Sequence, residues 1–362
     1  MLKQIELCNE CNACLEVCPV YLETRKEVDS PLSRLKNAKR IFSNEEVSWE
    51  VVESYYNDPM CGLCDFACPS EIKISEIIKD TRRELVTRGL APLDGHKKII
   101  ASILERGNSI EADPNKRLEW LPEPFVDRES DTLLYLGCLS SYLVKESATA
   151  SYLLLKKAGV DFRILRDEGC CGVYLYDTGK RDLAEKLFRE NATRFKELGI
   201  KKIIVPCAGC YTCFKHYYPN ILGRLDFEVY HIVDIIQNLI ESGTLKLKPI
   251  NAKMTYHDPC RLGRRMGKYD EPRQILEACG AMIIEMEKNR ENAPCCGAGG
   301  GIRSVFRDLS LSLAVKALEL AKTDTIVSLC PFCIFNFRWA SRKKGMDKKI
   351  QHIAEVVLKS MS

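Results

Sequence analysis

The sequence lacks the features that would indicate a membrane-spanning or secreted protein. No apolar run approaches the ~18 residues that a transmembrane helix needs, and the first residues, MLKQIELCNEC, contain no signal-peptide core. The net charge of +4 is spread along the chain without a basic stripe, which argues against nucleic acid as a partner. We therefore expect a cytoplasmic protein that contacts a membrane only through a partner subunit.

Nucleotide-binding fingerprints are also absent. The glycine-rich run GAGGGIR (297–303) follows a cysteine pair and lacks the Lys-Ser/Thr ending of a phosphate-binding loop. Because the chain has no FAD or NAD motif, we expect a partner to supply or accept electrons. The length of 362 residues, with 46% hydrophobic and 29% charged residues, is typical of a soluble protein of two or three domains.

Cysteine, in contrast, is abundant, with 19 residues in a chain that has no export signal. Because the cytosol keeps thiols reduced, a disulfide framework is a poor explanation for so many cysteines. Buried apolar thiols explain isolated cysteines, among which we place Cys213 and Cys279. They do not explain cysteines that recur at fixed spacing beside proline and glycine, so for these we predict metal or cluster ligation.

The run CNECNACLEVCP has the spacing C-x2-C-x2-C-x3-C-P, which is typical of ferredoxins that hold a [4Fe–4S] cluster. A second run, DPMCGLCDFACP, repeats the pattern but has Asp58 where its first cysteine is expected. In two-cluster ferredoxins the fourth cysteine of each run ligates the cluster of the other run. The predicted ligands are Cys8, Cys11, Cys14 and Cys68 for cluster I, and Cys18, Cys61 and Cys64 for cluster II.

Asp58 leaves the fourth position of cluster II open to three interpretations. The Asp58 carboxylate is an oxygen ligand, or the site holds a [3Fe–4S] cluster or an open iron, or Asp58 is only a turn residue before Pro59.

Helical spacing of apolar residues over 30–42, 45–56 and 70–89 predicts that this first part of the chain is helical. We place a helical two-cluster ferredoxin domain at 1–106. The polar segment 107–131, which contains several prolines, is predicted to be a linker or docking segment.

The rest of the chain contains one unit twice. Each copy has a strand ending in a cysteine, a helix, a second strand, an adjacent cysteine pair followed by glycine, a long helix, and a strand ending in C-x-x-C. The gaps on either side of the pair are 31 and 35 residues in the first copy and 34 and 33 in the second. This alternation predicts two α/β lobes with largely parallel sheets, which we place at 132–250 and 251–362.

Each lobe is predicted to gather five thiolates at the carboxyl edge of its sheet, where open α/β sheets bind ligands. The two sets are Cys138, Cys170, Cys171, Cys207 and Cys210, and Cys260, Cys295, Cys296, Cys330 and Cys333. Five sulfurs are one too many for a tetrahedral zinc site or an ordinary cubane, so we expect an opened, larger cluster, with zinc as the minor alternative. Gly172 and Gly297, which follow the pairs, are predicted to let the backbone approach the cluster.

These motifs resemble those of a known family. The repeated layout looks like the CCG domain, and the whole chain resembles the D subunits of heterodisulfide reductases, in which a helical two-cluster ferredoxin is fused to two CCG domains. Local matches include YHDPCRLGR and APCCGAGGG. The resemblance implies that each set of five cysteines binds one noncubane [4Fe–4S] cluster and that a disulfide substrate is cleaved between the two clusters.

The same architecture also resembles the iron–sulfur subunits of glycolate, lactate and anaerobic glycerol-3-phosphate dehydrogenases. That resemblance implies a different role, in which the chain relays electrons from a flavoprotein subunit to a quinone or similar acceptor.

For four residues near Cys260, the sequence allows either a functional or a structural role. His257 would be placed to protonate a leaving thiolate, but we favour a hydrogen-bonded structural role. Arg261, Arg264 and Arg265 either attract an anionic substrate or solvate a loop, and we expect the second.

Overall fold

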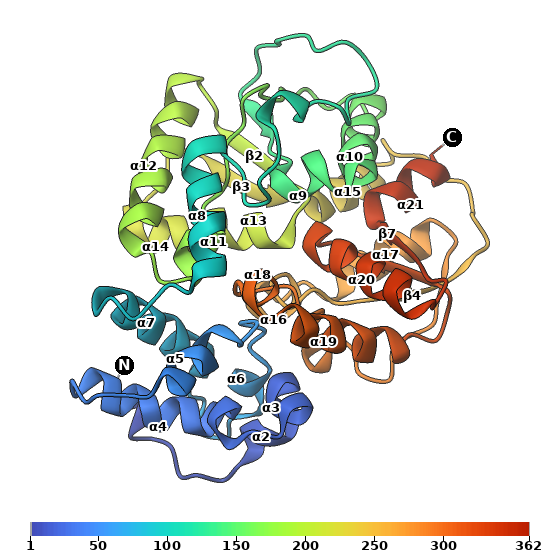
Figure 1. The fold of residues 1–362 in the computed structure, drawn as a ribbon. Coiled ribbons are helices and arrows are strands. Elements are labelled where there is room, and N and C mark those ends of the chain that lie inside the picture. Colours follow the sequence, from blue (N-terminus) through green and yellow to red (C-terminus); the bar gives the residue numbers. More distant parts are fainter. Residues whose placement is uncertain (1, 362) are drawn as a thin grey trace.

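The computed structural model describes residues 2–361. Figure 1 shows residues 2–93 of the helical module (2–106) in blue beneath two α/β lobes, with its last helix (Asp94–Arg106, teal) beside the first lobe. The first lobe (132–250) is green to yellow and the second lobe (251–361) is orange to red. The mixed α/β architecture with parallel sheets agrees with the prediction. Within residues 2–361, no helix is both long and apolar enough to cross a bilayer.

The helical module contains no strand among its described residues. Its helices are α1 (Leu2–Ile5), α2 (Ala13–Val17), α3 (Pro19–Thr24), α4 (Pro31–Phe42), α5 (Trp49–Tyr56), α6 (Leu63–Ala67), α7 (Ile74–Thr87) and α8 (Asp94–Arg106). Local sequence sets several of these boundaries. The hydroxyl of Ser30 caps α4 by accepting from the Ser33 N–H, with Pro31 at the first helical position, and Ser48 caps α5 in the same way.

The first lobe has a parallel sheet with the order β1 (Thr132–Leu134), β2 (Lys202–Val205) and β3 (Glu228–His231). Its helices are α9 (Gly137–Tyr142), α10 (Lys145–Lys157), α11 (Val173–Asp177), α12 (Arg181–Glu197), α13 (Ala208–Thr212), α14 (Tyr218–Leu222) and α15 (Ile232–Glu241), with a π-helical turn η3 (Cys213–Tyr217) after α13. The predicted strand at 160–165 is only an isolated bridge between Arg163 and Leu133.

The second lobe repeats this topology with one added strand. Its parallel sheet has the order β5 (Met282–Ile283), β4 (Lys253–Tyr256), β6 (Thr325–Ser328) and β7 (Lys349–His352). Its helices are α16 (Gly263–Met266), α17 (Asp270–Ala278), α18 (Ile302–Val305), α19 (Arg307–Glu319), α20 (Pro331–Lys344) and α21 (Ile353–Ser360). Strands β4, β6 and β7 therefore correspond to β1, β2 and β3 in order.

The last strand of each lobe ends in a histidine that caps the next helix. His231 caps α15 and His352 caps α21, each through Nδ1 and each with an acidic residue three positions later that completes a capping box. The free Nε2 of His352 reaches across to the carbonyl of Pro206 in the first lobe, 3.0 Å away. The capping histidine of the second lobe therefore also fixes the C-x-x-C loop of the first.

The segment 107–131 packs on the first lobe. The Trp120 side chain is buried, and its carbonyl accepts from the Thr149 hydroxyl at 2.5 Å. Arg117 forms a buried ion pair with Glu168, whose carboxylate also accepts from the Gly137 N–H at 2.8 Å. The segment is thus docked against the loop that precedes Cys138.

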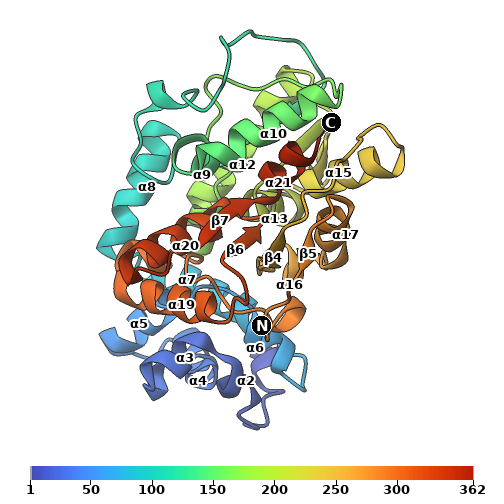
Figure 2. The same cartoon turned by 90° about the vertical axis from the view of Figure 1, so that its right-hand side faces the viewer.

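Arg82 of α7 joins all three parts of the molecule. Its fully buried guanidinium donates to the carbonyls of Tyr55 (2.6 Å) and Asp58 (2.7 Å) in the helical module, of Asp177 (2.9 Å) in the first lobe and of Gly300 (2.7 Å) in the second lobe. Figure 2 shows another contact between the module and the second lobe, where α19 lies over α3. Lys316 of α19 forms an ion pair there with Glu23 of α3.

We predict that Arg82→Met lowers the free energy of unfolding by about 3 kcal/mol or more, because it leaves four buried carbonyls without a donor. Urea unfolding followed by circular dichroism measures the change. The matched control is Arg83→Met at the next position, which is exposed and should change the stability by less than about 0.5 kcal/mol. Equal effects of the two substitutions would contradict the role given to Arg82.

Candidate metal centres

Site I lies at the edge of the helical module. A cavity of about 20 Å³ is lined by Cys8, Cys11, Cys14 and Cys68, which are the four cysteines assigned to cluster I from the sequence. The loop between α1 and α2 brings three of them together with Asn12 in a left-handed conformation. Burial, with a contribution from Cys8, raises the pKa of Cys14 to about 12. A buried thiolate there needs a compensating cation, as a metal cluster provides.

Site II is formed by Cys18, Cys61 and Cys64, all of which are buried. The charges of these three cysteines interact, and burial raises the pKa of Cys18 to about 11. Asp58 lies close enough to raise the pKa of all three thiols. The structure therefore brings together the four residues that the sequence assigned to site II.

The Asp58 carboxylate is engaged on both oxygens. Oδ1 accepts from the Met60 N–H at 2.6 Å, and Oδ2 accepts from Arg34 Nη1 at 3.0 Å. The first bond closes a turn around Pro59, as the turn interpretation expects, and the second is an ion pair with a fully buried arginine.

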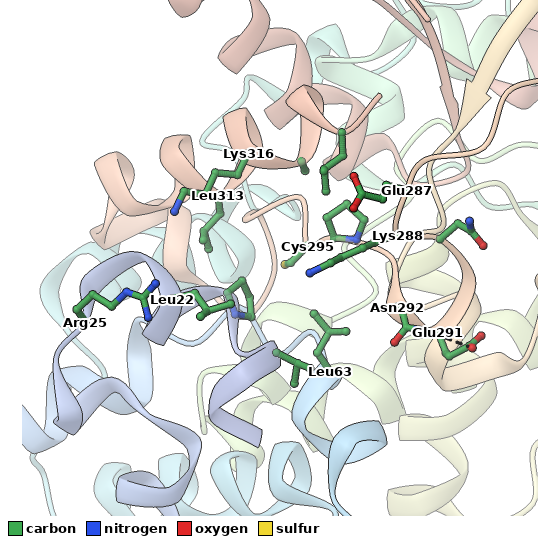
Figure 3. A pocket seen from close by; sticks show the side chains of 16 residues that line it. Leu22, Arg25, Leu63, Glu287, Lys288, Glu291, Asn292, Cys295, Leu313 and Lys316 are labelled. Atoms are coloured by element: carbon green, nitrogen blue, oxygen red, sulfur yellow. Dashed lines mark hydrogen bonds between the residues drawn. The ribbon is translucent and has the colours of Figure 1, made fainter. Parts of the chain in front are cut away.

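The cysteines of the two lobes face one shared cavity of about 90 Å³. It is lined by all five cysteines of the first set and by four of the second set, namely Cys138, Cys170, Cys171, Cys207, Cys210, Cys260, Cys296, Cys330 and Cys333. The tenth cysteine, Cys295, lines a separate cavity of about 660 Å³ between α3, α19 and the loop 287–294. Figure 3 shows this outer cavity, with Cys295 facing Leu22, Leu63 and Lys288.

Hydrogen bonds position each cysteine pair in the same way in both lobes. Three residues before the strand-end cysteine, the Tyr135 hydroxyl donates to the Gly169 carbonyl at 2.6 Å, and His257 Nε2 lies 3.1 Å from the Pro294 carbonyl. Each accepting carbonyl directly precedes a cysteine pair. His257 is therefore a hydrogen-bonded structural residue, as expected, and burial lowers its pKa.

The residue three positions after each C-x-x-C makes another repeated contact. The Cys213 thiol donates to the Cys171 carbonyl at 3.2 Å, and Asn336 Nδ2 donates to the Cys296 carbonyl at 2.6 Å. Cys213 does not line the shared cavity, and Cys279 is likewise buried in the core.

The second cysteine of each pair has a lowered pKa, as does Cys330 of the second lobe. Hydrogen bonds from Cys295 and Cys333 lower the pKa of Cys296 to about 6, and Cys333 Sγ lies 3.0 Å from Cys296 Sγ. In the first lobe, hydrogen bonds from Cys170, Cys210 and Cys213 lower the pKa of Cys171 in the same way. In each lobe, neighbouring thiols therefore favour the thiolate form of the second cysteine of the pair.

Contacts between thiols link the sites in space. The charges of Cys14 of site I and Cys18 of site II interact. Cys61 of site II packs with Cys295 of the second lobe, and Cys330 lies close enough to Cys207 of the first lobe for the two thiols to shift each other's pKa. The sites therefore form a chain from I through II and the second lobe to the first.

The donor sets suit clusters better than single ions. Within residues 2–361, no three Cys, His, Asp or Glu side chains converge where one metal ion would bind. In an iron–sulfur cluster each thiolate binds its own iron, so the sulfurs need not meet at one point. Site I and the two lobe sites fit such groups with thiolates alone.

The sequence comparisons agree with this arrangement. Residues 4–72 match the 4Fe-4S dicluster domain family, and residues 132–215 and 254–338 each match the cysteine-rich domain family CCG. The D subunit of the dihydromethanophenazine:CoB–CoM heterodisulfide reductase of Methanosarcina mazei is 31% identical over 99% of this chain and 95% of that protein. The chain belongs to the family of heterodisulfide reductase D subunits. It is thus an iron–sulfur oxidoreductase subunit, as its motifs indicate.

Other relatives carry different names. The B subunit of the fumarate reductase (CoM/CoB) of Methanothermobacter marburgensis is 31% identical over 98% of this chain and 72% of its own length. The EtfAB:quinone oxidoreductase of Syntrophomonas wolfei is 32% identical over 99% of this chain but only 58% of its own length. A crystal structure of a hypothetical protein from Helicobacter pylori covers 99% of this chain and 74% of its own, with a TM-score of 0.62 and 12% identity, which shows the fold alone.

In this member of the family, the glycines beside the second cysteine pair contact protein backbone. A Cβ on Gly299 would lie 2.5 Å from the Pro59 carbonyl, and one on Gly300 would lie 2.6 Å from the Asp58 carbonyl. The run that follows Cys296 is therefore glycine-rich because the site II loop packs directly on it.

Gly172 and Gly297 have positive φ, and a Cβ on Gly172 would meet Phe188 of α12, whereas one on Gly297 would meet the Ser310 carbonyl of α19. Their N–H groups donate to the Sγ atoms of Cys170 (3.4 Å) and Cys295 (3.3 Å). They orient the first sulfur of each pair, whereas their predicted approach to a cluster stays a prediction.

The expectation that three arginines solvate a loop was wrong. Arg261 and Arg264 are buried, and Arg265 is largely covered. Arg261 pairs with Asp177 of the first lobe, Arg264 donates to the Cys61 carbonyl at 2.8 Å, and Arg265 pairs with Glu76 of α7 at 2.8 Å. All three reach across an interface that the sequence alone does not reveal.

Sequence reasoning missed three residues that line the shared cavity, namely Ser109, Tyr174 and Asp177. Ser109 belongs to the docking segment, and its N–H donates to the Cys138 thiol and lowers its pKa. Asp177 ends α11, and its Oδ1 has no hydrogen-bond partner. No spacing rule singles out either residue, because both reach the cavity through tertiary packing.

Cys210→Ser and Cys213→Ser form a matched pair that tests the first-lobe site. We predict that Cys210→Ser lowers the iron content of anaerobically prepared protein by about four atoms per chain. Cys213→Ser should keep full iron content, because a serine hydroxyl can also donate to the Cys171 carbonyl. Iron and acid-labile sulfide analysis measures both, and loss of iron in Cys213→Ser would make that residue a ligand.

Proposed function

We propose that this chain takes electrons through two ferredoxin-type clusters to two noncubane [4Fe–4S] clusters and reduces a disulfide between them. The observation that carries the proposal is the single cavity lined by cysteines of both lobes. The names of the Methanosarcina relatives suggest the CoB–CoM heterodisulfide as the first substrate to test.

Reduction of a disulfide to two thiols consumes two electrons and two protons. The clusters, when bound, would supply the electrons one at a time. The chain contributes the thiolates that hold them and the backbone N–H groups of Gly172 and Gly297 that orient the cysteine pairs. All four sites filled would contain about 15 to 16 irons, and stoichiometric zinc in both lobes would contradict this assignment.

Electrons would enter at site I, where Cys11 is exposed to solvent. The thiol contacts support the order site I, site II, second lobe, first lobe. Because the chain has no flavin motif, the donor would be a flavoprotein or another electron-transfer subunit. The relatives are named as subunits of larger enzymes, which supports such a partner.

Relay to another acceptor is the second candidate function. It is favoured by the outer cavity of about 660 Å³, which reaches Cys295 of the second lobe and Leu63 beside site II without involving the first lobe (Figure 3). In this role a flavin-dependent 2-hydroxyacid or glycerol-3-phosphate dehydrogenase would be the donor, and a quinone or similar molecule the acceptor.

We predict that Cys171→Ala and Cys296→Ala each abolish disulfide reduction, because each thiol product must be held as a thiolate until it is protonated. The assay is anaerobic, with reduced viologen as donor and the CoB–CoM heterodisulfide as substrate. Reduction of the ferredoxin-type clusters should survive both changes. If the fully loaded wild-type protein reduces no disulfide but accepts electrons from a 2-hydroxyacid-oxidising flavoprotein, the relay function holds instead.

The order of the sites predicts a difference between the same two variants. Loss of the second-lobe cluster in Cys296→Ala should stop electrons from viologen before they reach the first lobe. Loss of the first-lobe cluster in Cys171→Ala should leave the second lobe reducible. Freeze-quench EPR after mixing with reduced viologen distinguishes the two cases, and equal reduction of the remaining lobe in both variants would refute the order.

A further inference from the structure

Site II differs from the other three sites because one of its four corner residues is not a cysteine. We propose that Asp58 is the counter-ion of Arg34 and not an iron ligand. Site II then offers three thiolates, those of Cys18, Cys61 and Cys64, which is the number that a three-iron [3Fe–4S] core needs. This inference is independent of the substrate that the lobes act on.

Both oxygens of the Asp58 carboxylate already accept hydrogen bonds within the protein. The Met60 N–H holds Oδ1 at 2.6 Å and Arg34 Nη1 holds Oδ2 at 3.0 Å. The first bond belongs to the turn that carries Pro59, and Met60 continues that turn with a positive φ of 60°. Both oxygens of the carboxylate are thus held by hydrogen bonds within the protein.

Arg34 has no alternative anion of comparable geometry. Its side chain is completely buried, and its other donors are taken by the Ser54 carbonyl (2.7 Å) and the Asn57 side-chain oxygen (2.6 Å). Asn57 is itself fixed by a hydrogen bond to Asp29 Oδ1 at 2.6 Å. Ligation of an iron by Asp58 would weaken this buried ion pair and leave Arg34 as a poorly compensated buried charge.

The position of Arg34 explains why the pair is kept. Its positive charge interacts with Cys18 and Cys64, and it opposes the effect of burial on the pKa of Cys18. A guanidinium at this place stabilises negative charge on the thiolates and on a reduced cluster. Asp58 thus serves site II indirectly, by holding the arginine that compensates its charge.

The direct test needs no substitution. The full-length protein is prepared anaerobically from cells fed aspartate labelled with ¹³C at the side-chain carboxylate, and ¹³C ENDOR is recorded on the site II signal. That signal is identified by its loss in Cys64→Ser. We expect no directly bonded carboxylate carbon, and a ¹³C coupling of the size given by a ligating carboxylate would overturn the proposal.

Substitutions give a second, independent measurement. Asp58→Cys should gain about one iron per chain, because it supplies the missing thiolate, and the oxidised protein should lose the EPR signal of the three-iron core. Asp58→Asn should keep that signal with unchanged spin count and shift the site II midpoint potential upward, since one negative charge is lost. Unchanged iron content in Asp58→Cys, or a changed cluster type in Asp58→Asn, would refute the proposal.

Asp65→Asn is the matched control for the loss of a carboxylate. Asp65 also lies beside Cys64 and is held by hydrogen bonds from Ser75. Asp65→Asn should leave the cluster type and the iron content unchanged. If Asp65→Asn changes the cluster type as Asp58→Cys does, then loss of either carboxylate disturbs site II in a general way, and the proposal fails.

Discussion

The guanidinium of Arg82 is the constraint on which the arrangement of the four sites depends. It is buried where the helical module and both lobes meet, and all its partners are backbone carbonyls. Backbone partners leave little freedom, because a carbonyl cannot rotate without moving its peptide. Two of these carbonyls belong to Asp58, at site II, and Gly300, four residues after Cys296. Arg82 thus fixes the distance between site II and the second lobe.

The two lobes are alike in the bonds that hold their cysteines and differ in the bonds that join them. Tyr135 and His257 form equivalent hydrogen bonds with different side-chain groups, and so do Cys213 and Asn336. Both lobes therefore keep a side chain that hydrogen-bonds at each position and the backbone carbonyl with which it pairs. The contacts to neighbouring parts, in contrast, differ between the lobes: Arg261 of the second lobe pairs with the first lobe, and Arg264 donates to the site II loop.

The sequence predicted the parts of this molecule that depend on local spacing. The cysteine runs, the duplicated unit, the helices around 31–42 and 74–87 and the grouping of Cys8, Cys11, Cys14 and Cys68 all follow from short-range patterns. Strands β3 and β7 were not predicted, because no cysteine motif follows them and only the histidine cap marks the end of each. Arg82, Asp177 and Ser109 were also missed, since their roles come from contacts between segments far apart in the chain.

The glycines at 299 and 300 have a consequence for how such a protein can change over time. Backbone lies against backbone there, with no room for a single methyl group on Gly299 or Gly300. A helical module transplanted from a relative would therefore have to bring a loop of the same shape as 58–60. Recombination between relatives can succeed only where both halves of this contact are inherited together, so the module and the second lobe form one evolutionary unit.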